Sequence, residues 1–133
     1  MSQALKHFEK ATRLAPEWTN PLNDMAWILA TRPDAKEEHG KKAVKFAERA
    51  AKLSKYKNCA ILDTLAVAYA SMARYNDAIR TAQAAVELAS HTGLDGLADS
   101  IRSRLKLYRQ YQPYRESAPE SVDRGDIKDN SNR

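Results

Sequence analysis

Apolar and small residues recur every three or four positions along most of the chain, up to about residue 111. This spacing places them on one face of an α-helix. The pattern therefore predicts six amphipathic helices, at residues 2–15, 20–31, 40–55, 58–72, 76–90 and 95–111. Pro16, Pro33 and Pro113 follow the first, second and last of these segments. Proline cannot continue a helix, so these residues support the predicted ends.

Asparagine side chains stand at the predicted start of three helices. Asn20, Asn58 and Asn76 precede or begin the second, fourth and fifth segments. A short polar side chain at this position can accept a hydrogen bond from a free N–H of the first turn. Pro21 follows Asn20 at the first helical position, where its missing N–H costs nothing. We therefore expect these three asparagines to be N-caps.

Two patterns of small and apolar residues alternate along the chain. The first pattern occurs at residues 4–11, 43–50 and 78–85, and the second occurs at residues 22–29 and 62–69. Small residues at these positions let neighbouring helices approach closely. The repeating unit is thus a helical hairpin. Such a unit cannot bury its apolar stripe alone and must stack on its neighbours.

The segment 59–92 resembles a tetratricopeptide repeat, a helical hairpin of 34 residues. The residues that match the family pattern are Leu65, Ala66, Tyr69, Ala78 and Ala85. Leu62, Ala82 and Ser90 stand where the family usually has two aromatic residues and a proline. Residues 20–57 look like a second copy with five extra residues between its helices.

The resemblance covers about residues 2–115. Residues 2–16 are similar to the second half of a repeat, and residues 104–117 are similar to a C-terminal capping helix and tail of bacterial members. The implied fold is an all-α, right-handed solenoid of helical hairpins: half a repeat, two repeats and a capping helix. We place this domain at residues 1–115. Residues 116–133 have no hydrophobic face, and we expect a disordered polar tail.

In this family the first helix of each hairpin lines a concave groove, so the resemblance implies a protein-binding surface. The implied groove residues are Asn20, Asn23, Trp27 and Thr31 on one helix and Asp63, Val67 and Ser71 on the other. We expect a segment or helix of a partner protein there, with apolar contact at Trp27 and Val67 and orientation from Asn23 and Asp63. Alternatively, the helix at 95–111 covers Trp27 and makes it part of the core.

Some family members hold acidic chaperone tails through lysines and asparagines in this groove. Here Trp27, Asp63 and Val67 replace the basic or polar companions. We therefore do not expect a carboxylate clamp.

The first predicted helix presents an apolar stripe without the preceding helix that would cover it in a longer array. Leu5, Phe8 and Leu14 form this stripe. An exposed stripe at the end of a solenoid is costly. Three explanations stay open: a longer array, a homodimer through this end, or packing on the next two helices with a small remaining patch.

Basic residues dominate the predicted helix at 40–55, while the net charge of the whole chain is only +5. Five of them fall on one side of the helix, opposite Phe46, Ala50 and Leu53. These residues are Lys41, Lys45, Arg49, Lys52 and Lys55. A solvated outer face explains this arrangement. Binding of nucleic acid or an anionic surface through residues 41–57 is the alternative, and it would weaken steeply with salt.

Three tyrosines recur at every third position near the end of the domain. Tyr108, Tyr111 and Tyr114 are interleaved with Arg109 and Arg115. Such a mixture can stack on nucleic-acid bases. We favour tyrosines that cover the last hairpin, and nucleic-acid binding is not expected.

Composition excludes several classes of protein and of site. The chain has 4 glycines and 5 prolines, too few for the frequent turns of an all-β fold. Cys59 is the single cysteine, and no histidine has a metal-ligating partner at suitable spacing. No glycine-rich phosphate loop, apolar membrane span or signal-peptide core is present in the sequence. We expect no catalysis, no metal, no cofactor and a cytoplasmic location.

Overall fold

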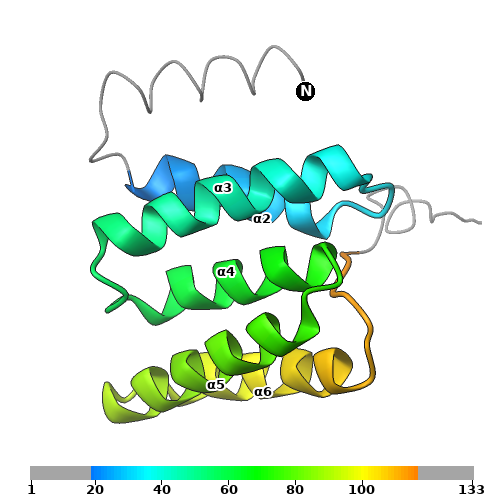
Figure 1. Ribbon diagram of the computed structural model, residues 1–133. Helices are drawn as coiled ribbons and strands as arrows, with labels where there is room; N and C mark the ends of the chain where they lie inside the picture. Colours follow the sequence, from blue (N-terminus) through cyan, green and yellow to red (C-terminus); the bar gives the residue numbers. More distant parts are fainter. Residues whose placement is uncertain (1–18, 117–133) are drawn as a thin grey trace, which may run out of the picture.

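The structure, a computed structural model, describes residues 19–116 and is helical throughout apart from short connections (Figure 1). Its helices are α2 (Thr19–Thr31), α3 (Glu37–Leu53), α4 (Cys59–Ser71), α5 (Tyr75–His91) and α6 (Asp95–Arg109). These described residues contain no strand, which confirms an all-α fold. The helix expected at 2–15, with Leu5, Phe8 and Leu14, lies outside the described residues, as does the polar tail from residue 117.

Helix α3 differs most from its prediction, because it begins three residues earlier than expected and ends two residues earlier. The connection before it was expected to run to residue 39. Instead, Glu37 and Glu38 form the first turn of α3, where negative charge is favourable at the positive end of the helix dipole. The backbone N–H of Lys36 donates to Nδ1 of His39 at 2.9 Å and closes this end. Some of the five extra residues in segment 20–57 therefore belong to α3 and lengthen it.

Asn58 is an N-cap as expected, since its side-chain oxygen accepts from the backbone N–H of Ile61 at 3.1 Å. The same expectation is wrong for Asn20 and Asn76, which lie inside the first turns of α2 and α5. At the second of these sites the connection has three residues, 72–74, as expected, but it lies one residue earlier in the chain. Ala73 adopts a left-handed backbone (φ 60°), and α5 begins two residues later.

Each helix packs against the next one along the chain, and α4 also packs against α2 and α6. Among the described helices, α3 and α5 make no contact with each other. Helices α2, α4 and α6 therefore form one row, and α3 and α5 form a second row beside it. Figure 1 shows α4 between the α2–α3 pair and the α5–α6 pair. None of these helices combines the length and apolar character that crossing a membrane requires.

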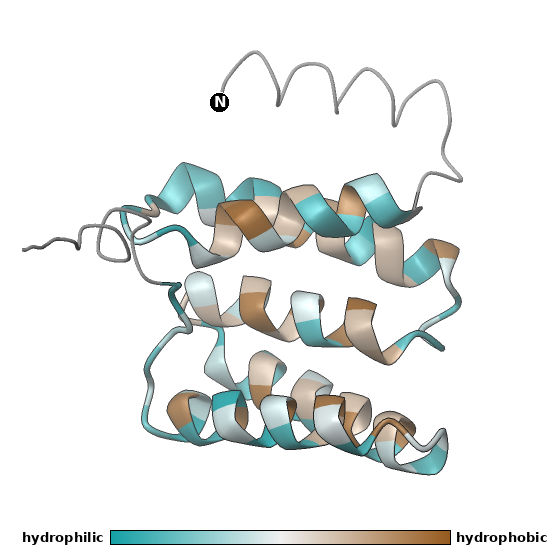
Figure 2. Cartoon of the chain, turned by 180° about the vertical axis from the view of Figure 1, so that it is seen from behind, coloured by the Kyte–Doolittle hydropathy of each residue, from teal (hydrophilic) through white to brown (hydrophobic). Residues whose placement is uncertain are grey.

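The small residues of the repeated pattern face the core. All six alanines of that pattern in the second row are fully buried: Ala43, Ala47, Ala50, Ala78, Ala82 and Ala85. Large side chains fill the spaces between the rows, among them Leu22, Leu29 and Ile101. Hydrophobic and hydrophilic segments consequently alternate along the helices in Figure 2. The burial confirms that these alanines allow close helix packing.

Gly40 of α3 lies close to the end of α4. A Cβ atom added to Gly40 would lie 2.5 Å from Sδ of Met72 and 3.1 Å from Oγ of Ser71. The neighbouring side chains would have to move to accept it, so the sequence has its smallest residue where the two helices meet.

Candidate functional site

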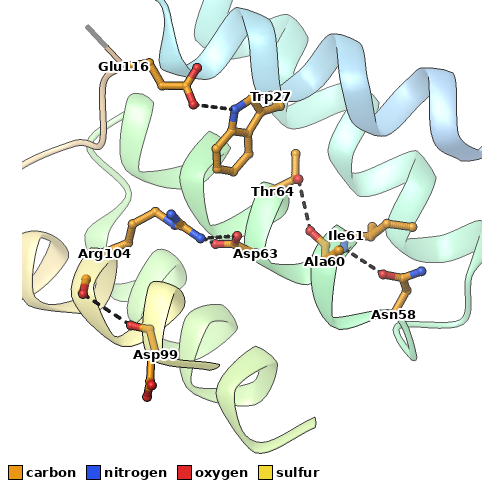
Figure 3. A network of polar contacts seen from close by, with 10 residues as sticks. Trp27, Asn58, Ala60, Ile61, Asp63, Thr64, Asp99, Arg104 and Glu116 are labelled. Carbon is orange, nitrogen blue, oxygen red and sulfur yellow. Dashed lines mark hydrogen bonds and ion pairs between the residues drawn. The ribbon is translucent and has the colours of Figure 1, made fainter. Parts of the chain in front are cut away.

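Three of the predicted groove residues line one cleft between α2 and α4. Asn23 and Trp27 of α2 face Asp63 of α4 across a cleft of about 500 Å³. The rest of its lining is Asp24, Ile28, Ala60 and Thr64. Figure 3 shows Trp27 next to Asp63 and Thr64, with its indole ring over the α4 side of the cleft.

The other predicted groove residues do not line this cleft. Val67 is fully buried in the core, and Thr31 is buried with its hydroxyl donating to the carbonyl oxygen of Trp27 at 2.7 Å. Ser71 is half-buried and donates to the carbonyl of Ala68. Asn20 is exposed at the beginning of α2. The cleft therefore involves residues 23–28 of α2 and the first half of α4, residues 60–64.

The chain itself covers the other end of the groove, because the segment after α6 returns to α2. The ring of Tyr114 lies against Trp27, with centroids 5.8 Å apart and planes inclined by 50°. The indole Nε1–H of Trp27 donates to the carboxylate of Glu116 at 3.2 Å (Figure 3). Trp27 thus faces the cleft with part of its ring and contacts the returning segment with the rest.

Two backbone carbonyls at the end of α2 hold the returning segment in place. The guanidinium of Arg115 donates to the carbonyl of Ala30 at 2.8 Å, and the backbone N–H of Glu116 donates to the carbonyl of Thr31 at 2.9 Å. The last carbonyls of a helix have no partner within the helix, and its C-terminus attracts positive charge. Helix α2 has no basic residue in its last turn, so Arg115 supplies both the donor and the charge.

A nearly buried ion pair joins α6 to the floor of the groove. The guanidinium of Arg104 donates to both carboxylate oxygens of Asp63, from Nε at 3.0 Å and from Nη2 at 2.5 Å. The side chain of Asp63 is 6% exposed and that of Arg104 is 13% exposed. The guanidinium also lies 5.3 Å from the ring centre of Trp27 and 5.1 Å from that of Tyr114. Arg104 therefore holds together three elements at one point.

Burial and the ion pair act in opposite directions on the pKa values of both partners. Burial raises the pKa of the Asp63 carboxyl above the usual value, while the hydrogen bonds and charge of Arg104 act in the opposite direction. Burial alone would lower the pKa of Arg104, but the bound carboxylate raises it, so the guanidinium stays charged. The nearby phenol of Tyr108 has a raised pKa because it is buried and close to Asp63.

Two buried polar atoms near the groove have no hydrogen-bond partner among the described residues: Oδ1 of Asn23 and the hydroxyl of Tyr108. Tyr108 is fully buried in the core, in agreement with the expectation that the tyrosines cover the last hairpin. The side chain of Asn23 also lines the cleft, although its Oδ1 atom is buried. Tyr111 packs edge-on against Tyr75 and is otherwise exposed.

Sequence reasoning missed Arg104, Tyr114 and Glu116 as parts of this site. Arg104 lies 41 positions from Asp63, so no local spacing connects the two. A carboxylate inside an otherwise apolar helix is nevertheless a signal, because a buried charge requires a partner. Glu116 was assigned to the polar tail, since nothing in its local sequence shows that it contacts α2.

The predicted basic face of α3 is exposed at Lys41, Lys45 and Lys52, but Lys55 was wrongly placed on it, because α3 ends at Leu53 and Lys55 has a left-handed backbone (φ 58°) in the turn that follows. Arg49 is half-buried and has an interaction partner. Of the opposite face, Phe46 and Ala50 are buried, but Leu53 is exposed because it is the last residue of the helix. Acidic residues interrupt this surface, as in the Lys41–Glu37 ion pair at 3.7 Å. The described part of the chain has no cluster of three potential metal ligands.

Comparison with known proteins gives no matching family model, no similar curated protein and no similar solved structure. The tetratricopeptide resemblance therefore remains a prediction that rests on the repeated pattern. The geometry of the cleft has to carry the functional argument.

Proposed function

We propose that this chain is a non-catalytic protein-interaction module of the tetratricopeptide type, and that its cleft between α2 and α4 binds an extended segment of a partner protein. The observation that carries the proposal is the lining of this cleft. Ile28 is 47% exposed there, beside the partly exposed ring of Trp27. The polar residues Asn23, Asp24 and Thr64 line the cleft around this apolar centre.

Such a lining suits recognition of a peptide. An apolar centre supplies affinity through burial, and polar groups around it orient the ligand. The cleft can take only a few side chains, as expected for an extended segment. The alternating pattern and the two rows of helices support the tetratricopeptide assignment, because the first helices of both hairpins lie in the same row as the groove.

The proposal is tested with a matched pair of substitutions in the full chain. Ile28→Asp places a charge in the cleft. Leu94→Asp changes a side chain of almost equal exposure, 48%, in the turn between α5 and α6. Peptides selected from a random library against the wild-type chain are titrated against both variants by calorimetry, and circular dichroism checks that each variant is folded.

We expect Ile28→Asp to weaken the selected peptides by about tenfold or more, since a buried unpaired charge costs several kcal/mol, and Leu94→Asp to leave them unchanged. Equal affinities for the two variants would contradict the cleft as the binding surface. A library that yields no binder to the wild-type chain would contradict peptide recognition itself.

Two other functions from the sequence stay as rivals. The exposed lysines of α3 favour binding of nucleic acid or an anionic surface, while the acidic residues among them favour a solvated face. Self-association through Leu5, Phe8 and Leu14 concerns residues outside the described part of the chain. Light scattering at low and high salt separates these rivals, because an apolar dimer survives salt and phosphate binding does not.

A further inference from the structure

The returning segment shows which peptide chemistry this groove accepts. Tyr114, Arg115 and Glu116 are three consecutive residues, and each contacts a different group of the groove. In an extended chain, alternate side chains point to the same side. Tyr114 and Glu116 both contact Trp27, while the side chain between them reaches a carbonyl of α2. Tyr114 and Glu116 thus share one receptor side chain, which is the pattern that alternate residues of an extended peptide would give.

We propose that the partner segment carries an aromatic–arginine–acid triplet, and that it replaces Tyr114, Arg115 and Glu116, which act as a competitor within the chain. This inference rests on the proposed function, because the partner must reach the same groove. The aromatic residue of the partner takes the position of Tyr114 against Trp27, and its cation and anion take those of Arg115 and Glu116.

Each receptor group selects for one member of the triplet. The ring of Trp27 and the guanidinium of Arg104 form a surface for an aromatic side chain, through stacking and cation–π attraction. The carbonyls at the end of α2 have no partner within the helix, so they accept donors from outside it and attract a cation, which suits arginine. The indole Nε1–H of Trp27 donates to a carboxylate. A peptide that lacks any of the three leaves a receptor group without its partner.

The competitor can be displaced because Tyr114 and Arg115 are only half-buried and Glu116 is exposed. The hydrogen bond between Trp27 and Glu116 is exposed, and residues 110–116 contain no helix that would anchor them. A segment tethered in this way competes with an effective concentration on the order of 1 mM. A partner gains an advantage if it continues beyond the triplet into the cleft, where Asn23 and Ile28 offer contacts that the three returning residues do not use.

The experiment uses a probe taken from the chain itself, an amidated peptide with the sequence of residues 110–116, QYQPYRE. One full-length variant combines Tyr114→Ala, Arg115→Ala and Glu116→Ala, which removes the competitor. The control variant Tyr111→Ala removes a tyrosine that is 73% exposed and contacts Tyr75 instead of Trp27. All chains also carry Trp18→Phe, so that Trp27 gives the single indole N–H signal in NMR spectra.

We expect the probe to shift the Trp27 signal of the triple variant, with an apparent dissociation constant about tenfold lower than in the Tyr111→Ala control. A probe with alanines in place of the triplet should bind neither chain. Equal affinity for both chains overturns the competitor. Binding of the alanine probe to the triple variant overturns triplet recognition, and so does the absence of a shift with millimolar QYQPYRE.

These outcomes can be told apart from those of the proposed function. Selected library peptides that depend on Ile28 but bind equally with and without the Tyr114–Glu116 triplet would leave the proposed function standing and refute the competitor. Conversely, selected peptides that bind Ile28→Asp as tightly as wild type, together with a QYQPYRE probe that binds only the triple variant, would refute the proposed function and leave the competitor standing. A dimer of the control chain that the triple variant abolishes would assign the segment to a second copy and overturn its role within the chain.

Discussion

Arg104→Met is the substitution that tests most directly how the groove is held together. It removes the cation from Asp63 while keeping a long apolar side chain beside Trp27 and Tyr114. The carboxylate of Asp63 is then left 6% exposed without a counter-ion. Breaking a buried ion pair from one side costs about 3–5 kcal/mol. We expect the free energy of unfolding to fall by this amount at pH 7. In a small domain, each kcal/mol lost lowers Tm by about 4–8 °C.

The cost of Arg104→Met should depend on pH in a definite direction. Burial already raises the pKa of Asp63 above its ordinary value of 3.8, and removing Arg104 removes the opposing influence. A carboxyl with a raised pKa favours the folded state when it is protonated. Its contribution is therefore present below the unfolded pKa and is lost as pH rises through the folded pKa. The variant should lose less stability at pH 4 than at pH 7, relative to wild type.

Urea unfolding of wild type and variants at both pH values measures these differences. Arg102→Met is the matched control on the same helix, since Arg102 pairs with Asp99 at 2.7 Å in an exposed ion pair worth about 1 kcal/mol or less. The double variant Asp63→Leu with Arg104→Met should recover most of the loss, because no unpaired charge remains. A cost below about 1 kcal/mol for Arg104→Met at pH 7, or a cost that grows in acid, would refute the reasoning.

Two further predictions concern the stability of single elements and use the same unfolding assay. Asn58→Ala should cost about 1 kcal/mol because it removes the N-cap of α4, whereas Asn76→Ala, inside the first turn of α5, should cost less than about half of that; similar losses would contradict the capping assignment. Tyr108→Phe should raise stability by about 1 kcal/mol, because it removes a buried hydroxyl that has no hydrogen-bond partner among the described residues; a loss of stability would show that this hydroxyl is hydrogen-bonded.

The helices could be predicted from the sequence because their signals are local. The spacing of small residues such as Ala47 and Ala82 identifies the buried faces, and Asn58 identifies the start of α4. The starts at Asn20 and Asn76 were misplaced by a residue or so, since several polar residues near each start could serve as the cap. Half of the groove was also predictable, because Trp27 and Asp63 lie beside the core stripes of their helices.

The other half of the groove depends on contacts between distant parts of the chain. Asp63 requires a cation, but the sequence offers many, and only the packing of α6 against α4 selects Arg104. The carbonyls of Ala30 and Thr31 require donors in the same way, and only the path of the chain after α6 brings residues 115 and 116 to them. Local sequence patterns predict that a buried carboxylate needs a cation and that helix-end carbonyls need donors, but they do not identify the residues that supply them.

These two needs link the fold to the proposed binding surface. Helix α2 ends without a basic residue, and α4 carries a carboxylate in an apolar face, so both helices expose groups that are unfavourable unless another segment covers them. Helix α6 and the segment after it cover both. Arg104 pairs with Asp63 in a nearly buried site, whereas Arg115 reaches α2 through a part-buried hydrogen bond and Glu116 through an exposed one. The buried contact stabilises the groove, and the contacts of Tyr114, Arg115 and Glu116 are the ones that the proposed partner segment would replace.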